Sequence, residues 1–552
     1  GFDISNSNIL LENCLAMRCK NNGFHLKNSH IDVRRGLVAY RNYELSTTPT
    51  SRSASSNGAG LRGFNSVLNF EDYREYIGIN NLLNFSRNDI GIDLYNSQII
   101  GPTSGSPSIV GSYGYIQAMF NNIGIHLRNS YYGFNGRTEI VNNKYGMHAH
   151  KSLLDLQFLT VEYNETIGLM SIGSEIQYNP YLYLYSPSND YRNSVGNGTY
   201  EQFDFFKNGQ HLTLRDSTFF PVKTANMPDV YGGMRFVSSF GVNTINGTQT
   251  ILPSVALTQN SYGEFTHALF KTNQLETMFP YDGPIYGALL HAIGGSRAHL
   301  RGSGNGATIF QGPAFLNGQK KTSLVYGSDG AHIEFNGPTF LGQAGVDVLV
   351  EQDSTVEFCP HTGYGGTYDT SSWNLTFPGN HTVVELHSTR ACLVANHGSQ
   401  IIMRDLGHYR DYWGSTLTSA NDYNLNDGFS YDDITSSGSM QFYPNPQDDT
   451  SINDLSTRYN LGTVTYTPGN PNYFLVDWKS SPQSVIENYS LGGMCLRALN
   501  GSKVKVQNVN FPAGWYNASG DYYDVSSNNC GRLRIWNIGP GSFLEAAYCS
   551  VS

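Results

Sequence analysis

Two aspartates in an aromatic segment are the residues of this chain best placed for acid–base chemistry. Asp405 opens the segment DLGHYRDYW, and Asp411 follows six residues later. Glycoside hydrolysis uses two carboxyl groups, one as acid and the other as base or nucleophile. We therefore take Asp405 and Asp411 as candidate catalytic residues. His408, Tyr409 and Trp413 are candidate glycan contacts, since ring faces stack on sugars. The alternative is a polar aromatic loop that only packs or binds.

Other motifs offer no stronger chemistry. Residues 58–63 have the glycine spacing of a dinucleotide-binding loop, but the Ser/Gly-rich context predicts an ordinary surface loop. Imidazole and carboxylate groups recur at one position of the repeat described below. There they could bind metal ions between successive repeats or form an outward polar row. These residues are Asp3, His25, Asp93, His126 and His148. We favour the polar row, and we predict no metal and no cofactor.

The composition narrows the class of protein. Only 14% of the 552 residues are charged, against about 25% in an average soluble protein, while 13% are aromatic. Many short strands and tight turns fit these values. The net charge of −10 argues against nucleic acid or an anionic membrane as partner. The chain has no apolar run of about 18 residues, so we predict no membrane span. Because the chain starts at Gly1 rather than Met, we expect a processed chain or a fragment.

Internal repetition is the most informative feature of the sequence. In six segments a Gly is followed six residues later by a Ser, and these segments begin at Gly1, Gly23, Gly91, Gly124, Gly146 and Gly168. Three of the spacings are 22 residues; the others are 68, taken as three periods plus two, and 33. The first residue after Gly is apolar, the third is mostly apolar and the second is usually polar, as in a strand. Asn commonly marks the corner that follows, because it tolerates a left-handed backbone.

A unit of about 22 residues with strands and corners has the size of one rung of a parallel β-helix. We therefore predict an all-β fold, a parallel β-helix with inserted loops. Rungs are expected over residues 1–180, with a loop at 44–63. Residues 181–285 are expected to be a loop-rich insertion, and residues 286–552 rungs with long loops, including an insertion at 405–490.

The second half repeats more loosely. Ser296, Ser399 and Ser502 are spaced by 103 residues, and each precedes an alternating segment. This spacing fits either rungs with longer loops or a larger three-part repeat. Cys392 and Cys495 occur in register upstream of two of these serines, which predicts core positions for them. The seven cysteines are odd in number and scattered, which favours free thiols over a disulfide framework.

These strands, Asn corners and abundant Tyr resemble the tail fibres and tailspikes of bacteriophages. The segments 503–517 and 530–552 resemble large virion structural proteins of T4-like cyanophages. The resemblance implies a right-handed parallel β-helix, a homotrimer, a place on the virion tail or baseplate outside the cell, and contact with host surface polysaccharide. We expect a structural virion protein. The alternatives are a polysaccharide-degrading tailspike, a hydrolase or lyase, and a bacterial surface adhesin.

Overall fold

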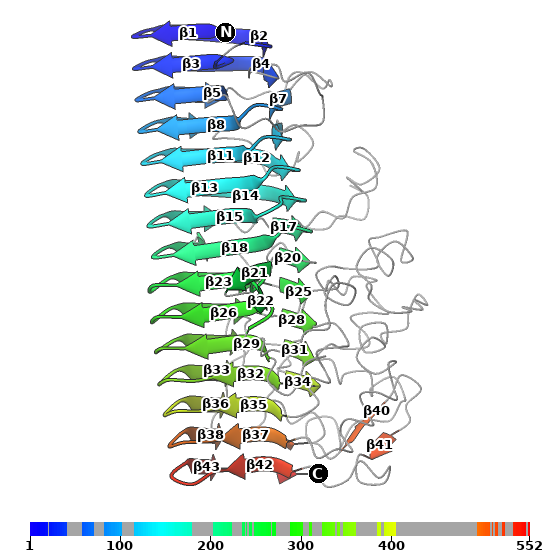
Figure 1. Ribbon diagram of the computed structural model, residues 1–552. Helices are drawn as coiled ribbons and strands as arrows, with labels where there is room; N and C mark the ends of the chain where they lie inside the picture. The colour runs from blue at the N-terminus through cyan, green and yellow to red at the C-terminus, as the bar shows by residue number, and fades with distance from the viewer. Residues whose placement is uncertain are drawn as a thin grey trace, which may run out of the picture.

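The chain forms a parallel β-helix, a stack of rungs that runs from the N-terminus to the C-terminus (Figure 1). The computed structural model describes residues 1–19, 21–40, 58–70, 82–101, 115–178, 203–222, 234–237, 239, 242–245, 248–266, 268–271, 287–301, 308–311, 323–336, 339–342, 346–359, 384–387, 391–404, 494–507, 510–511, 514–516, 522–524, 534–547 and 550–551. These residues contain strands and no helix, so none of them forms a helix that could cross a membrane. The predicted all-β parallel β-helix is confirmed.

Each rung contributes strands to two or three faces of the β-helix. Face one is a sheet of 15 parallel strands, one from every rung. Its strands are β1 (Phe2–Ser5), β3 (Phe24–Lys27), β5 (Ala59–Phe64), β8 (Ile90–Tyr95), β11 (Ile123–Arg128), β13 (Tyr145–His150), β15 (Ile167–Ile172), β18 (Gln210–Arg215), β23 (Val255–Thr258), β26 (Leu290–Ile293), β29 (Ser323–Ser328), β32 (Val346–Val350), β35 (Ala391–Ala395), β37 (Met494–Ala498) and β42 (Arg534–Ile538).

Faces two and three belong to one larger sheet, bent where its longest strands change register. Face two contains β2 (Asn8–Met17), β4 (His30–Tyr40), β6 (Val67–Phe70), β9 (Gln98–Ile100), β12 (Tyr131–Val141), β14 (Leu153–Glu162), β16 (Glu175–Tyr178), β19 (Thr218–Pro221), β24 (Tyr262–Thr266), β27 (Arg297–Arg301), β30 (His332–Asn336), β33 (Thr355–Cys359), β36 (Gln400–Arg404), β38 (Lys503–Gln507) and β43 (Phe543–Ala547). The later halves of β2, β4, β12 and β14 continue onto face three.

Face three is completed by shorter strands. These are β7 (Leu82–Ser86), β10 (Tyr115–Met119), β17 (Phe203–Phe206), β20 (Met234–Val237), β25 (Ala268–Lys271), β28 (Thr308–Gln311), β31 (Thr339–Gly342) and β34 (Val384–His387). On the last two rungs, β39 (Asn510–Phe511) pairs in parallel with β44 (Ser550–Val551), with the same offset as β38 and β43. Two antiparallel pairs lie outside the parallel sheets: β21 (Val242–Ile245) with β22 (Thr248–Ile251), and β40 (Gly514–Tyr516) with β41 (Tyr522–Asp524).

The strand register corrects the expected boundaries. Residues 59–64, assigned largely to a loop at 44–63, form β5, so one rung rather than two lies between Gly23 and Gly91. The expected insertion at 181–285 contributes strands to all three faces, from β17 to β25. That prediction was therefore wrong over these strands. The glycine signature disappears there because His211 and Ser254 take the place that Gly168 occupies one rung earlier, between paired strand residues.

The spacing of 103 residues has two different origins. Three rung-to-rung steps separate Ser296 from Ser399, since Arg297, His332, Thr355 and Gln400 pair in turn on face two. A single step joins Ser399 to Ser502, because Gln400 pairs directly with Lys503. The three-part repeat is thus wrong, and rungs with longer loops are confirmed. Pairing depends on the alternation within strands, which loop length does not alter.

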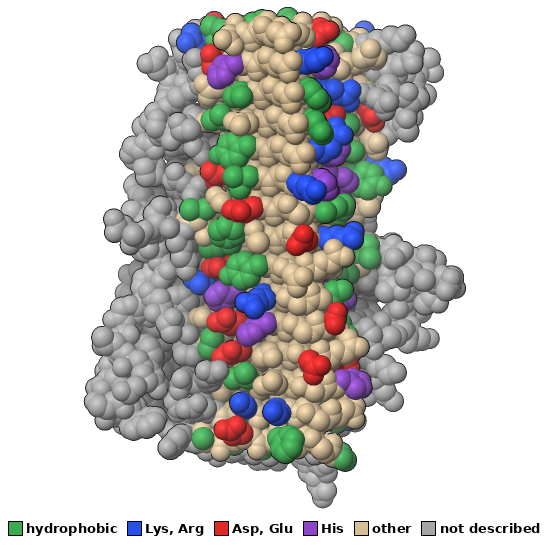
Figure 2. Space-filling view, turned by 90° about the vertical axis from the view of Figure 1, so that its left-hand side faces the viewer, with side chains coloured by type: hydrophobic (Ala, Val, Ile, Leu, Met, Phe, Trp, Pro, Cys, Tyr) green, Lys and Arg blue, Asp and Glu red, His purple; other side chains and the backbone are tan. Residues whose placement is uncertain are grey.

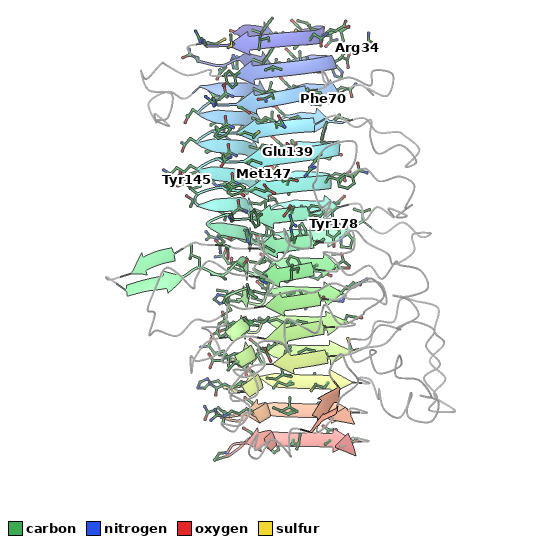
Figure 3. All side chains as sticks on the ribbon, turned by 90° about the vertical axis from the view of Figure 1, so that its right-hand side faces the viewer. Arg34, Phe70, Glu139, Tyr145, Met147 and Tyr178 are labelled. Atoms are coloured by element: carbon green, nitrogen blue, oxygen red, sulfur yellow. The ribbon has the colours of Figure 1, made fainter. Side chains whose placement is uncertain are left out.

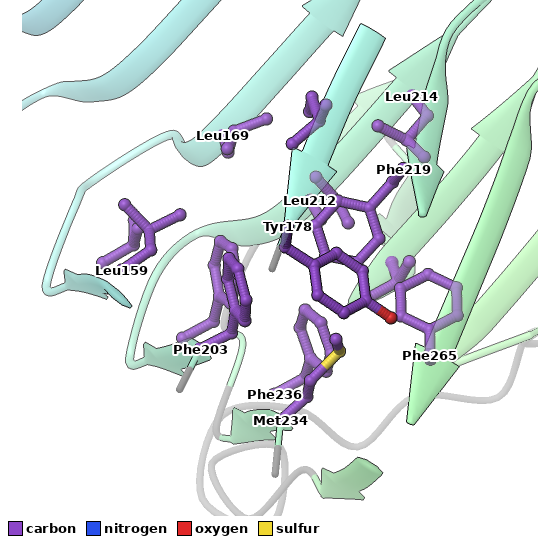
Figure 4. Packing of buried hydrophobic residues seen from close by; sticks show 14 of the residues in the cluster. Leu159, Leu169, Tyr178, Phe203, Leu212, Leu214, Phe219, Met234, Phe236 and Phe265 are labelled. Atoms are coloured by element: carbon purple, nitrogen blue, oxygen red, sulfur yellow. The ribbon is translucent and has the colours of Figure 1, made fainter. Parts of the chain in front are cut away.

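Inward-facing apolar side chains form one continuous core along the stack. Figure 3 shows the side chains rung by rung, and Figure 4 shows the packing around Tyr178, Phe203 and Phe236. The rings of Phe205, Phe236, Phe270 and Phe310 stack on successive rungs, with centroids 4.9, 4.9 and 4.3 Å apart. One rung alone could not bury such side chains, so each rung depends on its neighbours for stability.

A ladder of buried asparagines holds the corner that leads from face three to face one. The Asn143 side-chain oxygen accepts hydrogen bonds from the backbone N–H and the side-chain amide of Asn121, at 2.8 and 3.0 Å. Asn164 and Asn208 repeat the arrangement on later rungs. An added Cβ at Gly146 would lie 2.1 Å from the carbonyl oxygen of Gly168, so the close approach of the rungs requires glycine.

A second ladder, of serines, follows the corner from face one to face two. The N–H of Ser130 donates to the hydroxyl of Ser152, and the N–H of Ser152 donates to that of Ser174, at 3.1 and 3.0 Å. Residues that precede the serines of this corner adopt the left-handed conformation. Asn6 and Asn28, which precede Ser7 and Ser29, are two examples, and their side-chain amides also hydrogen-bond to each other. The left-handed Asn corner is therefore confirmed.

Among the described cysteines, Cys14, Cys19 and Cys359 carry thiols that are not joined in a disulfide. Cys392 and Cys495 lie on β35 and β37, each directly before a buried leucine of the core. The prediction that their own side chains pack in the core concerns atoms outside the described set.

Candidate functional site

The catalytic and glycan-binding candidates from the sequence lie outside the described residues. These are Asp405, His408, Tyr409, Asp411 and Trp413. The strand that leads to them, β36, ends at Arg404 on face two. The described residues bring together two other polar clusters, one on face one and one on face two.

The first is the Asp93 cluster, in which Arg62, Asp93, His126 and Arg128 meet on the outside of face one. The register places Arg62, Asp93 and His126 side by side on three successive rungs. Asp93 Oδ2 lies 3.0 Å from Arg62 Nε, and its Oδ1 lies 3.1 Å from Arg128 Nη2 and 3.3 Å from His126 Nδ1. The Asp93 side chain is only 5% exposed. An outward carboxylate is thus enclosed by three nitrogen-bearing neighbours.

The charges around Asp93 decide its ionisation. Burial by itself would raise its pKa, but the contact with His126 and the charges of Arg62 and Arg128 outweigh burial, so the pKa is lowered. One rung further, burial and the neighbouring His126 lower the pKa of His148 to about 4. Asp93 is therefore ionised at neutral pH, and His148, one rung beyond the cluster, is neutral.

The Asp93 cluster confirms the predicted outward row. Asp3 and His25 are the N-terminal members of this row, and Asp3 Oδ1 lies 3.2 Å from His25 Nδ1. Within the described part of the chain, no three His, Cys, Asp or Glu side chains converge in a geometry that could hold a metal ion.

The second is the Glu264 cluster, formed on face two by Tyr262, Glu264, His299, Arg301 and Glu334. Glu264 is buried although its strand position points outward, and Arg301 Nε lies 2.9 Å from its Oε1. The Tyr262 hydroxyl donates to Glu264 Oε2 at 2.8 Å. His299 stands between two carboxylates, with Nδ1 3.9 Å from Glu264 and Nε2 3.6 Å from Glu334.

Further contacts surround Glu334. Asn336 Nδ2 donates to it at 3.2 Å, and the Cys359 thiol lies 3.4 Å from the same oxygen. Burial would raise its pKa, but His299, these two donors and His332 together lower it. Acidic and histidine side chains gather on the lower left of Figure 2. The arrangement, carboxylate–imidazole–carboxylate, can accept hydrogen bonds from hydroxyl groups and pass a proton between two acids.

The sequence held a signal for this cluster that the glycine alignment missed. Glu264, His299, Glu334 and Glu357 each stand three residues after the first corner position of their rung, which is occupied by Ser261, Ser296, Ala331 and Ser354. Aligning the second half on these corners would have placed the four side chains in one outward row.

Comparison of the chain with protein-family models, with curated proteins and with solved structures finds no match.

Proposed function

We propose that this chain is a structural protein of a bacteriophage tail, a fibre, spike or baseplate-associated β-helix that serves as a rigid scaffold and contacts host surface polysaccharide. The observation that carries the proposal is the unbroken register of 15 rungs on face one. A single core and two hydrogen-bonded ladders support that stack. Such a stack resists bending, since every rung is fixed by main-chain hydrogen bonds to both neighbours.

The lateral surface supports the polysaccharide part of this proposal. Faces one and two carry hydrogen-bonding groups in rows along the helix axis, together with exposed aromatic rings. Phe64, 38% exposed, stacks on Tyr95 with ring centroids 5.1 Å apart, and Arg128 lies over the other ring at 5.4 Å. Rings combined with directional donors and acceptors are the groups that recognise sugars. We further propose that the working form is a homotrimer on the virion tail.

The experiment combines a mass measurement with a binding assay. The purified chain should have a native mass near three times its 61.0 kDa, and it should retain envelope polysaccharide from candidate host cells on size-exclusion chromatography. A monomer that melts at ordinary temperature would contradict the scaffold, and loss of retention on every polysaccharide would remove the glycan contact.

Polysaccharide cleavage is the second candidate function, and the Glu264 cluster is the observation that favours it. Two carboxyl groups next to an imidazole could divide the roles of acid and base. Cleavage would shorten the polysaccharide in the same chromatographic assay. Glu334→Gln would abolish the shortening if the Glu264 cluster is responsible, whereas Asp405→Asn or Asp411→Asn would abolish it if the aromatic segment is responsible. Retained chains of unchanged length would exclude catalysis on that polysaccharide.

A further inference from the structure

The two left-handed corners of the β-helix are built from different residues. Between faces one and two, the left-handed positions of the first five rungs hold Asn6, Asn28, Asn65, Asn96 and Asn129, with φ between 48° and 53°, and those of the next three rungs hold Lys151, Gly173 and Asp216. Asn adopts this conformation at little cost. Between faces three and one, successive rungs hold Arg87, Phe120, Asn142, Tyr163 and Lys207 at φ of 56°, 58°, 56°, 54° and 49°. We call these five residues the corner strip.

The corner strip has a symmetric order along the helix axis. Its members lie on successive rungs, since the backbone N–H groups of Arg87, Phe120, Asn142 and Tyr163 each donate to the rung that carries the next member. The order along the axis is therefore cation, ring, amide, ring, cation. Rungs are about 4.8 Å apart, so the two rings stand about 10 Å apart. Figure 3 looks at this side of the molecule, with Tyr145 at the start of the strand that follows the strip.

Each ring of the strip carries a cation beside it and an exposed surface. Arg87 Cζ lies 5.4 Å from the centre of the Phe120 ring, and Lys207 Nζ lies 5.7 Å from the centre of the Tyr163 ring. Phe120 is 44% exposed and Tyr163 is 40% exposed, values otherwise reached among the described apolar residues mainly on the first and last rungs. The rings are therefore available to a ligand.

Packing accounts for only part of these two rings, since Tyr163 contacts the buried ring of Phe206 edge-on, with centroids 5.6 Å apart, and is still 40% exposed. A left-handed backbone disfavours residues with a large side chain, and an exposed ring recovers little from burial. The cations return only a modest part, since exposed cation–π pairs are weak. Asn142, on the rung between, shows that the same corner accepts the residue that its backbone prefers. Unfavourable conformations of this kind concentrate at ligand sites.

We infer that the corner strip binds a linear acidic polysaccharide that lies along the helix axis. Phe120 and Tyr163 stack on sugar rings, Asn142 hydrogen-bonds to hydroxyl groups between them, and Arg87 and Lys207 pair with carboxylates of the chain. Beside the strip, two residues further along each rung, the groups are mixed: Asp89, Asn122, Lys144 and Glu165. The two end cations of the strip therefore supply the selectivity for an anion. This inference rests on the proposed glycan contact and assigns its place and chemistry.

The decisive variant is the double substitution Phe120→Asn and Tyr163→Asn. Asn suits the left-handed backbone, so the fold is expected to be as stable as the original or more so. Retention on immobilised sodium alginate, a linear polyuronate, is expected to fall about tenfold or more. The matched control is Phe2→Ala, which removes a ring of similar exposure, 39%, from the first rung of face one and should leave retention unchanged. Arg87→Gln with Lys207→Gln should weaken retention and flatten its dependence on salt.

Four outcomes would overturn the inference. These are no retention of the unmodified protein on alginate, equal retention by the double Asn variant, equal retention on the neutral glucan pullulan, and a double variant that is less stable than the original protein. The last would mean that the rings serve packing. If the double variant still binds host polysaccharide as tightly as the original protein, the strip is excluded while the proposed glycan contact stands.

Discussion

Replacing Asn143 by Ala tests the buried asparagine ladder most directly. The Asn143 side-chain oxygen accepts from the backbone N–H and the side-chain amide of Asn121, at 2.8 and 3.0 Å. Its side-chain nitrogen donates to the carbonyl of Ala118 at 2.9 Å and to Asn164 Oδ1 at 3.1 Å. Asn121 and Asn143 are fully buried. Alanine cannot replace any of these hydrogen bonds.

The cost follows from which groups lose a partner. The side-chain amide of Asn121 keeps its bond to the carbonyl of Phe85, and Asn164 keeps the bond from the backbone of residue 143. The backbone N–H of Asn121 loses the acceptor shown for it, and the carbonyl of Ala118 loses a donor. A buried polar group left without a partner costs about 1–3 kcal/mol. We therefore expect the free energy of unfolding to fall by about 2–6 kcal/mol.

The assay compares this variant with Asn84→Ala, which removes an outward amide that makes one long bond of 3.3 Å to Gln117. That control is expected to lose less than about 1 kcal/mol. Denaturant unfolding followed by circular dichroism gives the stabilities, and hydrogen exchange reports protection of the Asn121 amide. Equal destabilisation by both variants, or unchanged protection of Asn121 in Asn143→Ala, would refute the reasoning.

Three further predictions concern the core, the acid response and a buried ion pair. Leu127→Asp places a carboxylate in the fully buried core and should abolish soluble expression, because an unpaired buried charge costs several kcal/mol. The pKa of His148 is lowered to about 4, so its contribution to stability is present above about pH 6.5 and is lost as the pH falls toward 4. The melting temperature should accordingly drop less between pH 7.5 and 5 in His148→Gln than in the original protein or in His150→Gln, a change on the exposed end of the same strand. Arg235 forms a buried ion pair with Asp204; Arg235→Met should lower the free energy of unfolding by about 3–5 kcal/mol, and a loss under 1 kcal/mol in denaturant melts would argue against the pair.

Much of the fold was readable from the first 180 residues, because there the rungs are short and carry three signals at once. The glycine at the close approach, the apolar positions after it and the Asn of the corner recur together around Gly91 and Gly124. Each has a local physical cause, a backbone contact or a left-handed turn, so a pattern of residue types was sufficient to identify it.

The rungs after residue 180 were missed for an equally local reason. His211 fills the position of the glycine, and its ring nitrogen Nδ1 lies 3.1 Å from the amide of Asn208, the last asparagine of the ladder. Burial holds the pKa of this histidine at about 3, so the ring is neutral in the core. With the glycine gone, the rung remained recognisable only by its alternating residues, Leu212 and Leu214 among them.

The sequence by itself determined which side chains face inward, because alternation along a strand depends only on neighbouring residues. It could not determine which outward side chains meet, since that depends on rung lengths that run from 22 residues between Phe2 and Phe24 to 103 between Leu393 and Leu496. Only the stacked structure brings Glu264 beside His299 and Phe120 two rungs from Tyr163. Contacts between rungs arise from register, and register is set by the pairing of whole strands across loops of any length.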